Sequence, residues 1–183
     1  SNNAAGNSLL AYDSTGALVQ SLPTGGLGGV SGNAGGVAAD GHLVAVVNFQ
    51  SQSVSLFELT NDGFVLTDTI ATMSPPVSVT FGHGHLYVLG TISVESHKLY
   101  GHNIESASDG SATLLKADGS AAQVGVAGDQ LLLTEKSNAV EVVDLRSGAI
   151  AGTSVEVPIP AGSDTPLGLT TRGPLLTADL YWA

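Results

Sequence analysis

The feature that most constrains this fold is a pattern that recurs about every 44 residues along the chain. Leucines that begin short apolar strands recur at spacings of 43, 45 and 44 residues, at Leu43, Leu86, Leu131 and Leu175. A second set of strand starts has spacings of 45, 44 and 42 residues, at Leu9, Val54, Lys98 and Val140. Because two independent markers share one period, we interpret the chain as a tandem array of one structural unit.

Each unit is predicted to contain four short antiparallel strands joined by tight turns. The apolar runs 44–47 and 131–133 do not alternate with polar residues, which is typical of a sheet buried on both faces. Turns after the third strands carry a glycine, as in Asp62-Gly63 and Ser147-Gly148, where a hairpin needs positive φ. Four short strands per 44 residues is the period of a propeller blade. The sequence therefore predicts an all-β fold made of β-propeller blades.

The order of the strands predicts a propeller domain that is incomplete at both ends. We expect one partial domain over residues 1–183, which begins with the last two strands of one blade and ends with the first two strands of another. The expected units are a half blade over 8–24, blades over 33–72, 73–117 and 118–158, and a half blade over 159–183.

Composition excludes several classes of partner. Charged residues make up only 11% of the chain, and the net charge is −11 with five Lys plus Arg. A phosphate backbone or an anionic membrane surface would be repelled, so we expect neither nucleic acid nor a membrane as a partner. The chain has no cysteine, which excludes disulfides and thiol chemistry. No motif indicates a cofactor. A surface rich in Ser, Thr and Gly with few lysines favours a secreted protein.

Several separated stretches resemble one family of propellers. They are residues 7–12, the glycine run 25–29, residues 46–48 with 53–57, residues 134–138 and residues 165–168. Together they resemble the seven-bladed lactonase-family β-propellers, which are similar to 6-phosphogluconolactonase and 3-carboxymuconate cyclase. The resemblance implies seven blades, a funnel lined by loops, and lactone chemistry. A ring of seven blades needs about 300 residues at this period, so these 183 residues would supply about four blades.

Loops between the second and third strands are expected to share one face of a propeller and to surround the mouth of its channel. Glu135 is a candidate general base there, and Lys136 and His97 are candidate acids or oxyanion partners. The candidate ligand-binding residues at the same mouth are Asn48, Gln50, Glu95, Asn138, Asp179 and Tyr181. The alternative is that these residues only form turns and cover strand ends. We expect Glu135 and Lys136 to lie in a solvated loop.

Three other patterns carry weaker signals. The glycines of residues 25–36 do not fit a dinucleotide fingerprint, because Ser31 interrupts the spacing and no helical period follows, so we interpret them as a flexible or tightly turned connector. His83 and His85 could hold a metal ion, but no acid lies in the same turn. We therefore predict a solvent-facing turn and no metal. No Gly-x-Ser-x-Gly motif supports a serine hydrolase.

Three functions remain open at this point. The first is a lactonase or cyclase-type enzyme acting at the channel mouth, the second a propeller that only binds a ligand or protein, and the third a structural secreted protein. Because a half blade stands at each end, we also expect a second polypeptide to complete the propeller. The C-terminal part of the same precursor is favoured as that polypeptide over another copy of this chain.

Overall fold

The computed structural model describes the backbone of residues 1–160, 165–172 and 175–182, and the side chains of residues 1–160 and 165–171. Within these ranges the protein consists of β-strands and loops, without a helix. Accordingly, the described residues offer no helix that could cross a membrane. The predicted all-β fold is confirmed.

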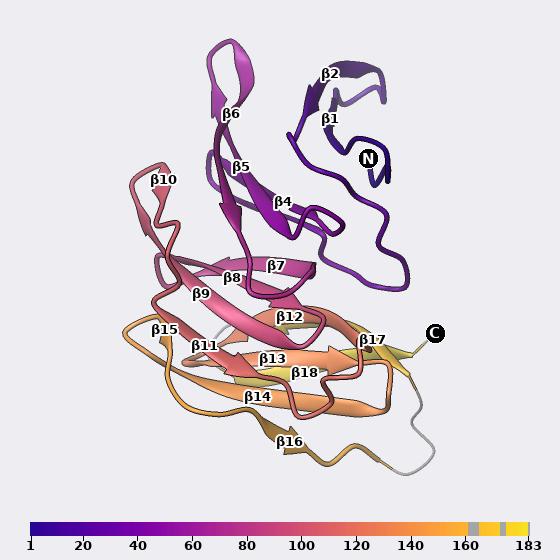
Figure 1. The fold of residues 1–183 in the computed structure, drawn as a ribbon, viewed down its shortest axis with the longest axis vertical. Coiled ribbons are helices and arrows are strands. Elements are labelled where there is room, and N and C mark those ends of the chain that lie inside the picture. Colours follow the sequence, from indigo (N-terminus) through magenta and orange to yellow (C-terminus); the bar gives the residue numbers. More distant parts are fainter. Residues whose placement is uncertain (161–164, 173–174, 183) are drawn as a thin grey trace.

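Three antiparallel sheets form the body of the protein (Figure 1). The first contains, in spatial order, β3 (Val37–Asp40), β4 (Leu43–Asn48), β5 (Ser53–Thr60) and β6 (Gly63–Ala71). The second contains β7 (Pro76–Gly82), β8 (His85–Gly90) and β9 (Ser93–Tyr100), with β10 (Asn103–Ile104) and β11 (Gly110–Thr113) both paired to β9. The third contains β12 (Ala121–Ala127), β13 (Gln130–Glu135) and β14 (Ala139–Arg146), with β15 (Ala149–Ile150) and β16 (Val155–Val157) both paired to β14.

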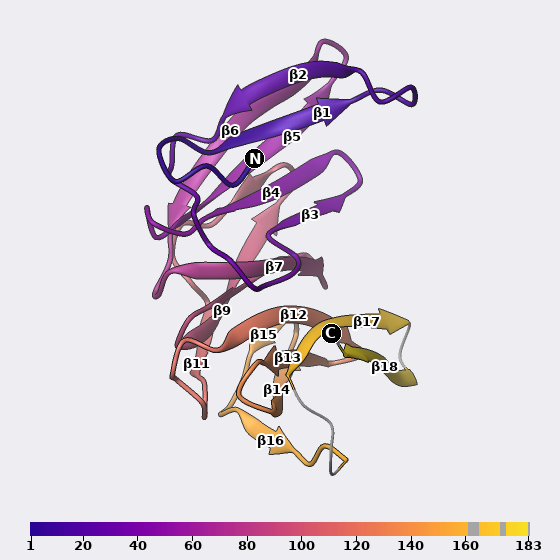
Figure 2. The ribbon, with the colours of Figure 1, turned by 90° about the vertical axis from the view of Figure 1, so that its right-hand side faces the viewer.

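A two-stranded sheet stands at each end of this body. β1 (Ser8–Tyr12) pairs with β2 (Leu18–Pro23), and β17 (Pro166–Arg172) pairs with β18 (Leu175–Trp182). The sheets follow one another in chain order, with β1–β2 at one end of the stack and β17–β18 beside β12 of the third sheet (Figure 2). The first strands β3, β7, β12 and β17 contact one another in sequence. These are partial propeller blades arranged side by side.

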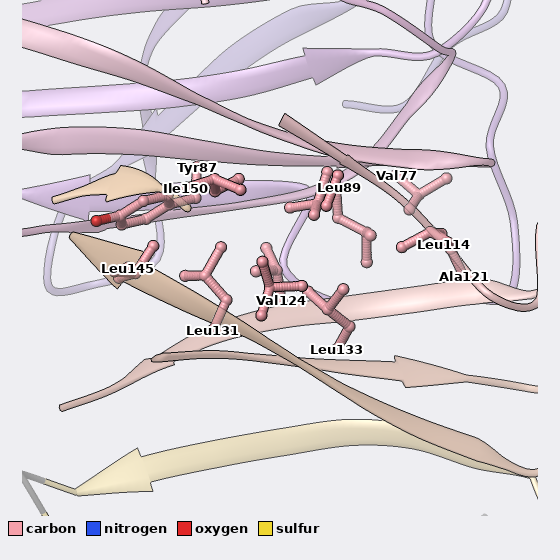
Figure 3. Packing of buried hydrophobic residues seen from close by; sticks show 13 residues of the cluster. Val77, Tyr87, Leu89, Leu114, Ala121, Val124, Leu131, Leu133, Leu145 and Ile150 are labelled. Carbon is pink, nitrogen blue, oxygen red and sulfur yellow. The ribbon is translucent and has the colours of Figure 1, made fainter. Parts of the chain in front are cut away.

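Apolar side chains fill the spaces between neighbouring sheets. The first and second sheets are joined by a cluster that includes Leu56, Ile70 and Leu86. The second and third are joined by a cluster that includes Tyr87, Leu131 and Leu133, with side chains from both sheets pointing toward one another (Figure 3). Each such buried side chain contributes roughly 1.5–3 kcal/mol to folding. The continuous apolar runs in the sequence are therefore explained by burial on both faces.

Two sequence predictions about strand positions are wrong. The third strand of the second sheet begins at Ser93, five residues before the predicted start at Lys98, so Glu95 and His97 lie inside β9 and are buried. His85 is the first residue of β8 and only 3% exposed, although a solvent-facing turn was predicted for it. In both places a polar residue is buried because it has a specific hydrogen-bond partner, which its residue type alone does not reveal.

Candidate functional site

One end of the stacked sheets collects the ends of the second strands and the starts of the third strands. The glycine-rich segment 25–36 crosses this end and bonds to all three complete sheets. Gly36 O accepts the N–H of Val47 at 3.0 Å, Gly35 O accepts the N–H of Val79 at 2.8 Å, and the N–H of Ala34 donates to Ala122 O at 3.2 Å. The segment is therefore a tightly packed connector. The sequence had left open whether it was flexible or tightly turned.

Close packing explains why glycines are needed in this segment. A Cβ at Gly35, which has φ of +72°, would lie 2.6 Å from Ser78 Oγ, and a Cβ at Gly26 would overlap the Asn48 side chain at 2.5 Å. Real Cβ atoms do not approach other atoms so closely. The glycines therefore let the backbone lie directly on the sheet ends.

A pocket of about 270 Å³ lies between this segment and the sheet ends. Its polar lining comes from Ser1 and Asn2 and from Ser31, Gly32 and Asn33 of the glycine-rich segment, and its apolar lining includes Val47 and Val77. We call it the mouth pocket. Asn33 Nδ2 donates to Val77 O at 3.1 Å, which fixes this side of the pocket.

One predicted site residue, Lys136, lies beside Gly32 of the mouth pocket, and a second, Gln50, lies against the glycine-rich segment. Lys136 is half-buried, and its Nζ lies 3.5 Å from where a Cβ on Gly32 would stand. Within the described residues Lys136 forms no ion pair. Gln50 is exposed, its N–H donates to Leu27 O at 3.1 Å, and its side chain covers Gly29. Both side chains thus contact the glycine-rich segment, Lys136 at a residue that lines the pocket and Gln50 at one that does not.

Asn138 is not among the residues that line this pocket. Asn138 occupies the turn before β14 at φ of 63°, and its Oδ1 accepts the N–H of Thr165 at 2.6 Å. The backbones of Asp179 and Tyr181 lie in β18, but their side chains fall outside the described residues.

Asn48 belongs to a saturated buried network that joins β1–β2 to the first complete sheet. Its Oδ1 accepts the hydroxyl of Thr24 at 2.6 Å and an amide N–H of Asn7 at 3.1 Å. Its Nδ2 donates to Ser55 Oγ at 2.8 Å. Asn48 is 0% exposed, so these bonds satisfy it without a ligand.

Glu95 forms one of three equivalent joints between successive sheets. In each complete sheet the third residue of the third strand bonds to the linker that leads into that sheet. Glu95 Oε1 accepts the N–H of Met73 at 3.1 Å. Glu141 accepts the N–H groups of Leu115 and Lys116 at 3.0 to 3.1 Å. At the first joint Ser55 Oγ donates to Thr24 O at 2.7 Å. Glu95 is therefore placed to hold two blades together.

Glu141 is a buried acid that the sequence analysis missed. It is 0% exposed and also accepts the hydroxyl of Ser154. A signal was present, because Val54-Ser55, Val94-Glu95 and Val140-Glu141 repeat a polar residue after a valine at the same point of the period. Aligning the third strands on this pair also corrects the start of β9.

His97 lies against Glu95 within β9. Its Nδ1 faces Glu105 O at 3.0 Å, so this nitrogen carries a proton and donates. Its Nε2 lies 3.6 Å from Glu95 Oε2 and has no hydrogen-bond partner among the described residues. The side chain is 1% exposed and is not among the residues that line the mouth pocket.

Glu135 ends β13 with its side chain turned into the protein, beneath the linker 114–120. It is 0% exposed, so the prediction of a solvated loop is wrong for this residue. Burial, with a smaller contribution from the Glu141 carboxylate, raises the pKa of Glu135 to about 8. Ser120 Oγ donates to its Oε2 at 3.4 Å, and its Oε1 has no partner among the described residues. Glu135 is thus a neutral carboxyl near pH 7.

The two neighbouring histidines have different surroundings. His83 is exposed at φ of 50°, and its ring contacts Gly128 O at 2.8 Å. His85 is bonded to Asp109 at 2.9 Å and to His83 O, and stacks on Tyr87. The described part of the chain has no group of three or more metal-ligating acids and histidines.

No family model and no curated protein matches this chain. Solved structures do match its fold. One, from Bacteroides uniformis and named as a candidate 6-phosphogluconolactonase, is 17% identical with a TM-score of 0.61, over 86% of this chain and 50% of that chain. A functionally unknown protein from Desulfotomaculum acetoxidans is 16% identical with a TM-score of 0.57, over 85% and 55%. Kuenenia stuttgartiensis hydrazine synthase is 16% identical with a TM-score of 0.59, over 88% and 45%.

At these identities the similarity shows the fold alone. The fold is a β-rich architecture that is shared with the B. uniformis protein. The chain spans about half the length of the solved structures it matches.

Proposed function

We propose that this protein binds a small lactone or carboxylate ligand in the mouth pocket. The observation that carries the proposal is the half-buried Lys136 beside Gly32, a cation without an acidic partner among the described residues. A half-buried ammonium binds a carboxylate or a polarised lactone carbonyl more strongly than an exposed one does, because less water competes for it. The amides of Gln50 and Asn33 would bind the ligand's hydroxyl groups.

The net charge of the protein limits how many negative charges a ligand of this pocket can carry. A net charge of −11 opposes ligands that carry several negative charges. We therefore expect a neutral lactone or a monocarboxylate rather than a phosphorylated one. This ligand class also agrees with the lactonase-family resemblance of the sequence and with the fold that is shared with the B. uniformis protein.

Lactone hydrolysis at the same pocket is a second candidate. It is favoured by the raised pKa of Glu135, which directly precedes Lys136 in the chain. A carboxyl with a pKa near the working pH is suited to proton transfer. Because Glu135 is 0% exposed, this role requires the linker 114–120 to move when the ligand binds, whereas binding alone does not.

The test compares ligand binding by the wild-type protein and by two matched variants. Calorimetric titration with gluconate and with glucono-1,5-lactone should give binding that Lys136→Met weakens about tenfold, corresponding to roughly 1.4 kcal/mol. Methionine keeps the apolar stem and removes the charge. Lys116→Met is the control, because Lys116 contacts Glu156 on β16 and not the pocket.

Equal affinity of Lys136→Met and wild type for both probes would refute the proposal. Hydrolysis is followed separately by acid release from the lactone in a pH-stat. If Glu135→Gln abolishes acid release while gluconate still binds, the protein is a lactonase. If the wild-type protein releases no acid above the spontaneous rate, the binding function alone stands.

A further inference from the structure

Two histidines stand at the joint between the first and second sheets, at the end of the strands opposite the mouth pocket. His42 lies in the turn between β3 and β4, and His102 lies in the turn between β9 and β10. Both residues are exposed. Both line a pocket of about 330 Å³ and a second pocket of about 500 Å³. The two side chains therefore border the same space, although they belong to different sheets.

Strand β5 contacts both histidine turns and sets their positions. The N–H of Leu59 donates to His42 O at 2.7 Å, which holds the turn of the first sheet. The carboxylate of Glu58, the residue before Leu59, pairs with the ring of His102 in the second sheet. Two consecutive residues of one strand thus bond to the two histidines.

At the next joint along the stack the corresponding turns pack directly against each other. A Cβ on Gly148, in the turn after β14, would lie 2.8 Å from His83 O and 2.4 Å from His85 Nδ1. Only glycine allows so close an approach. At the first joint His102 occupies the place of Gly148, and here the turns border the two pockets.

Glu58 determines which ring nitrogen of His102 is available to a ligand. His102 Nδ1 lies 2.5 Å from Glu58 Oε1, so Nδ1 carries a proton and donates it to the carboxylate. In the neutral ring Nε2 then holds a lone pair, and it has no hydrogen-bond partner among the described residues. A carboxylate that accepts from one ring nitrogen, and thereby leaves the other to a metal, is the usual arrangement around a metal-ligating histidine.

The other histidines of the chain do not offer such a site. His85 and His97 are 3% and 1% exposed. His83 is exposed, but its Nε2 contacts Gly128 O at 2.8 Å. The ring of His42, by contrast, forms no hydrogen bond or ion pair with a described residue.

We propose that His42 and His102 bind one divalent transition-metal ion of the zinc, nickel and copper class across this joint, with Glu58 orienting His102. Neutral imidazole nitrogens are ligands that these ions prefer. Asp40 and Glu58 also line the pockets, and the net charge of −11 attracts cations. The described residues hold no group of three or more metal-ligating acids and histidines, so water completes the coordination.

A metal bound here would connect a turn of the first sheet to a hairpin of the second. Because the unfolded chain does not hold the two rings together, the ion binds the folded chain more tightly and stabilises it. Coordination positions filled by water also leave the ion open to a further ligand. The site lies at the opposite end from the mouth pocket and does not depend on the function proposed there.

The test titrates Zn²⁺ alone into the untagged protein at about pH 7.5, by calorimetry. The wild type should bind one ion per chain, and its Tm should rise as zinc is added. His42→Ala and His102→Ala should each weaken binding at least tenfold, because each removes one of the two protein ligands. Glu58→Ala should weaken it about tenfold, because the ring of His102 loses its orienting partner. Both histidines are exposed, so their variants should unfold like the wild type in the absence of metal.

Two controls separate this site from general binding to an acidic surface. His83→Ala removes an exposed histidine outside the pockets and should bind zinc as the wild type does. Ca²⁺ prefers carboxylate oxygens and should give no comparable binding. Electron paramagnetic resonance of the Cu²⁺ complex should show two imidazole nitrogens in the wild type and one in each single-histidine variant.

Several results would overturn the proposal. They are a wild type that binds no zinc, an unchanged affinity in any of His42→Ala, His102→Ala and Glu58→Ala, an equal loss in His83→Ala, equal binding of Ca²⁺, or a copper spectrum with fewer than two nitrogens in the wild type.

Discussion

Replacing Glu135 with Gln should make the folded protein more stable than the wild type at pH 8. Below about pH 4.5 the Glu135 carboxyl is protonated in both the folded and the unfolded chain. Between pH 4.5 and about 8 the unfolded chain loses this proton while the folded chain keeps it, because burial raises the folded pKa. The free energy of unfolding of the wild type therefore falls as the pH rises through this window.

The size of the effect follows from the shift in pKa. Each unit of pKa shift lowers the free energy of unfolding by about 1.4 kcal/mol once the pH reaches the folded pKa. A shift of the Glu135 pKa from 4.5 to about 8 therefore corresponds to roughly 4 to 5 kcal/mol at pH 8. Glutamine has nearly the same volume and no charge to bury, so the variant does not bear this cost. For a chain of this size the difference corresponds to a rise in Tm of roughly 10 °C.

The assay is thermal and urea unfolding between pH 5 and 8.5 at one fixed protein concentration. Wild type and Glu135→Gln should have similar stability near pH 5 and should separate progressively toward pH 8. Glu156→Gln is the control, because the Glu156 side chain is 48% exposed. The claim that the buried carboxyl is neutral would be wrong in either of two cases. The free energies of unfolding of wild type and Glu135→Gln could show the same dependence on pH over the whole range, or the variant could be less stable than wild type at pH 8.

Two further predictions concern the joints that hold the sheets and the connector. Glu141→Ala leaves the half-buried N–H groups of Leu115 and Lys116 without their acceptor. It should lower the free energy of unfolding by roughly 1 to 3 kcal/mol, measured by urea unfolding. A loss under about 0.5 kcal/mol would show that water replaces the carboxylate. Gly35→Ala should cost more than Gly119→Ala, because both glycines have positive φ but only Gly35 has an atom, Ser78 Oγ, within 3 Å of the added Cβ. Equal unfolding midpoints for these two variants would contradict the close packing of the connector.

The period of the sequence predicted the sheets because it is tied to backbone geometry. Turn glycines and apolar strand starts recur wherever a hairpin must reverse and a strand must be buried, whatever the protein does. The same reasoning misplaced the start of β9, because Glu95 and His97 are polar and were assigned to a loop. The N–H of Met73 stabilises the Glu95 carboxylate inside the sheet, and this partner lies 22 residues away in the chain.

The candidate site was harder to predict because neighbours in a strand face opposite ways. Glu135 and Lys136 are adjacent in sequence, yet Glu135 is buried under the linker 114–120 and Lys136 reaches the glycine-rich segment. The pocket itself depends on where residues 25–36 cross the sheet ends. Those contacts are made mostly by backbone atoms, which leave little trace in the sequence beyond the glycines.

Binding at the mouth pocket is tested most directly by following backbone amide signals in NMR spectra during a titration with gluconate at pH 7. Binding there should give shifts that saturate together at Gly32, Asn33, Gln50 and Lys136, and that disappear in Lys136→Met. Shifts confined to the separate apolar pocket lined by Val142 and Val155, or no saturable shift at all, would contradict binding at the mouth pocket.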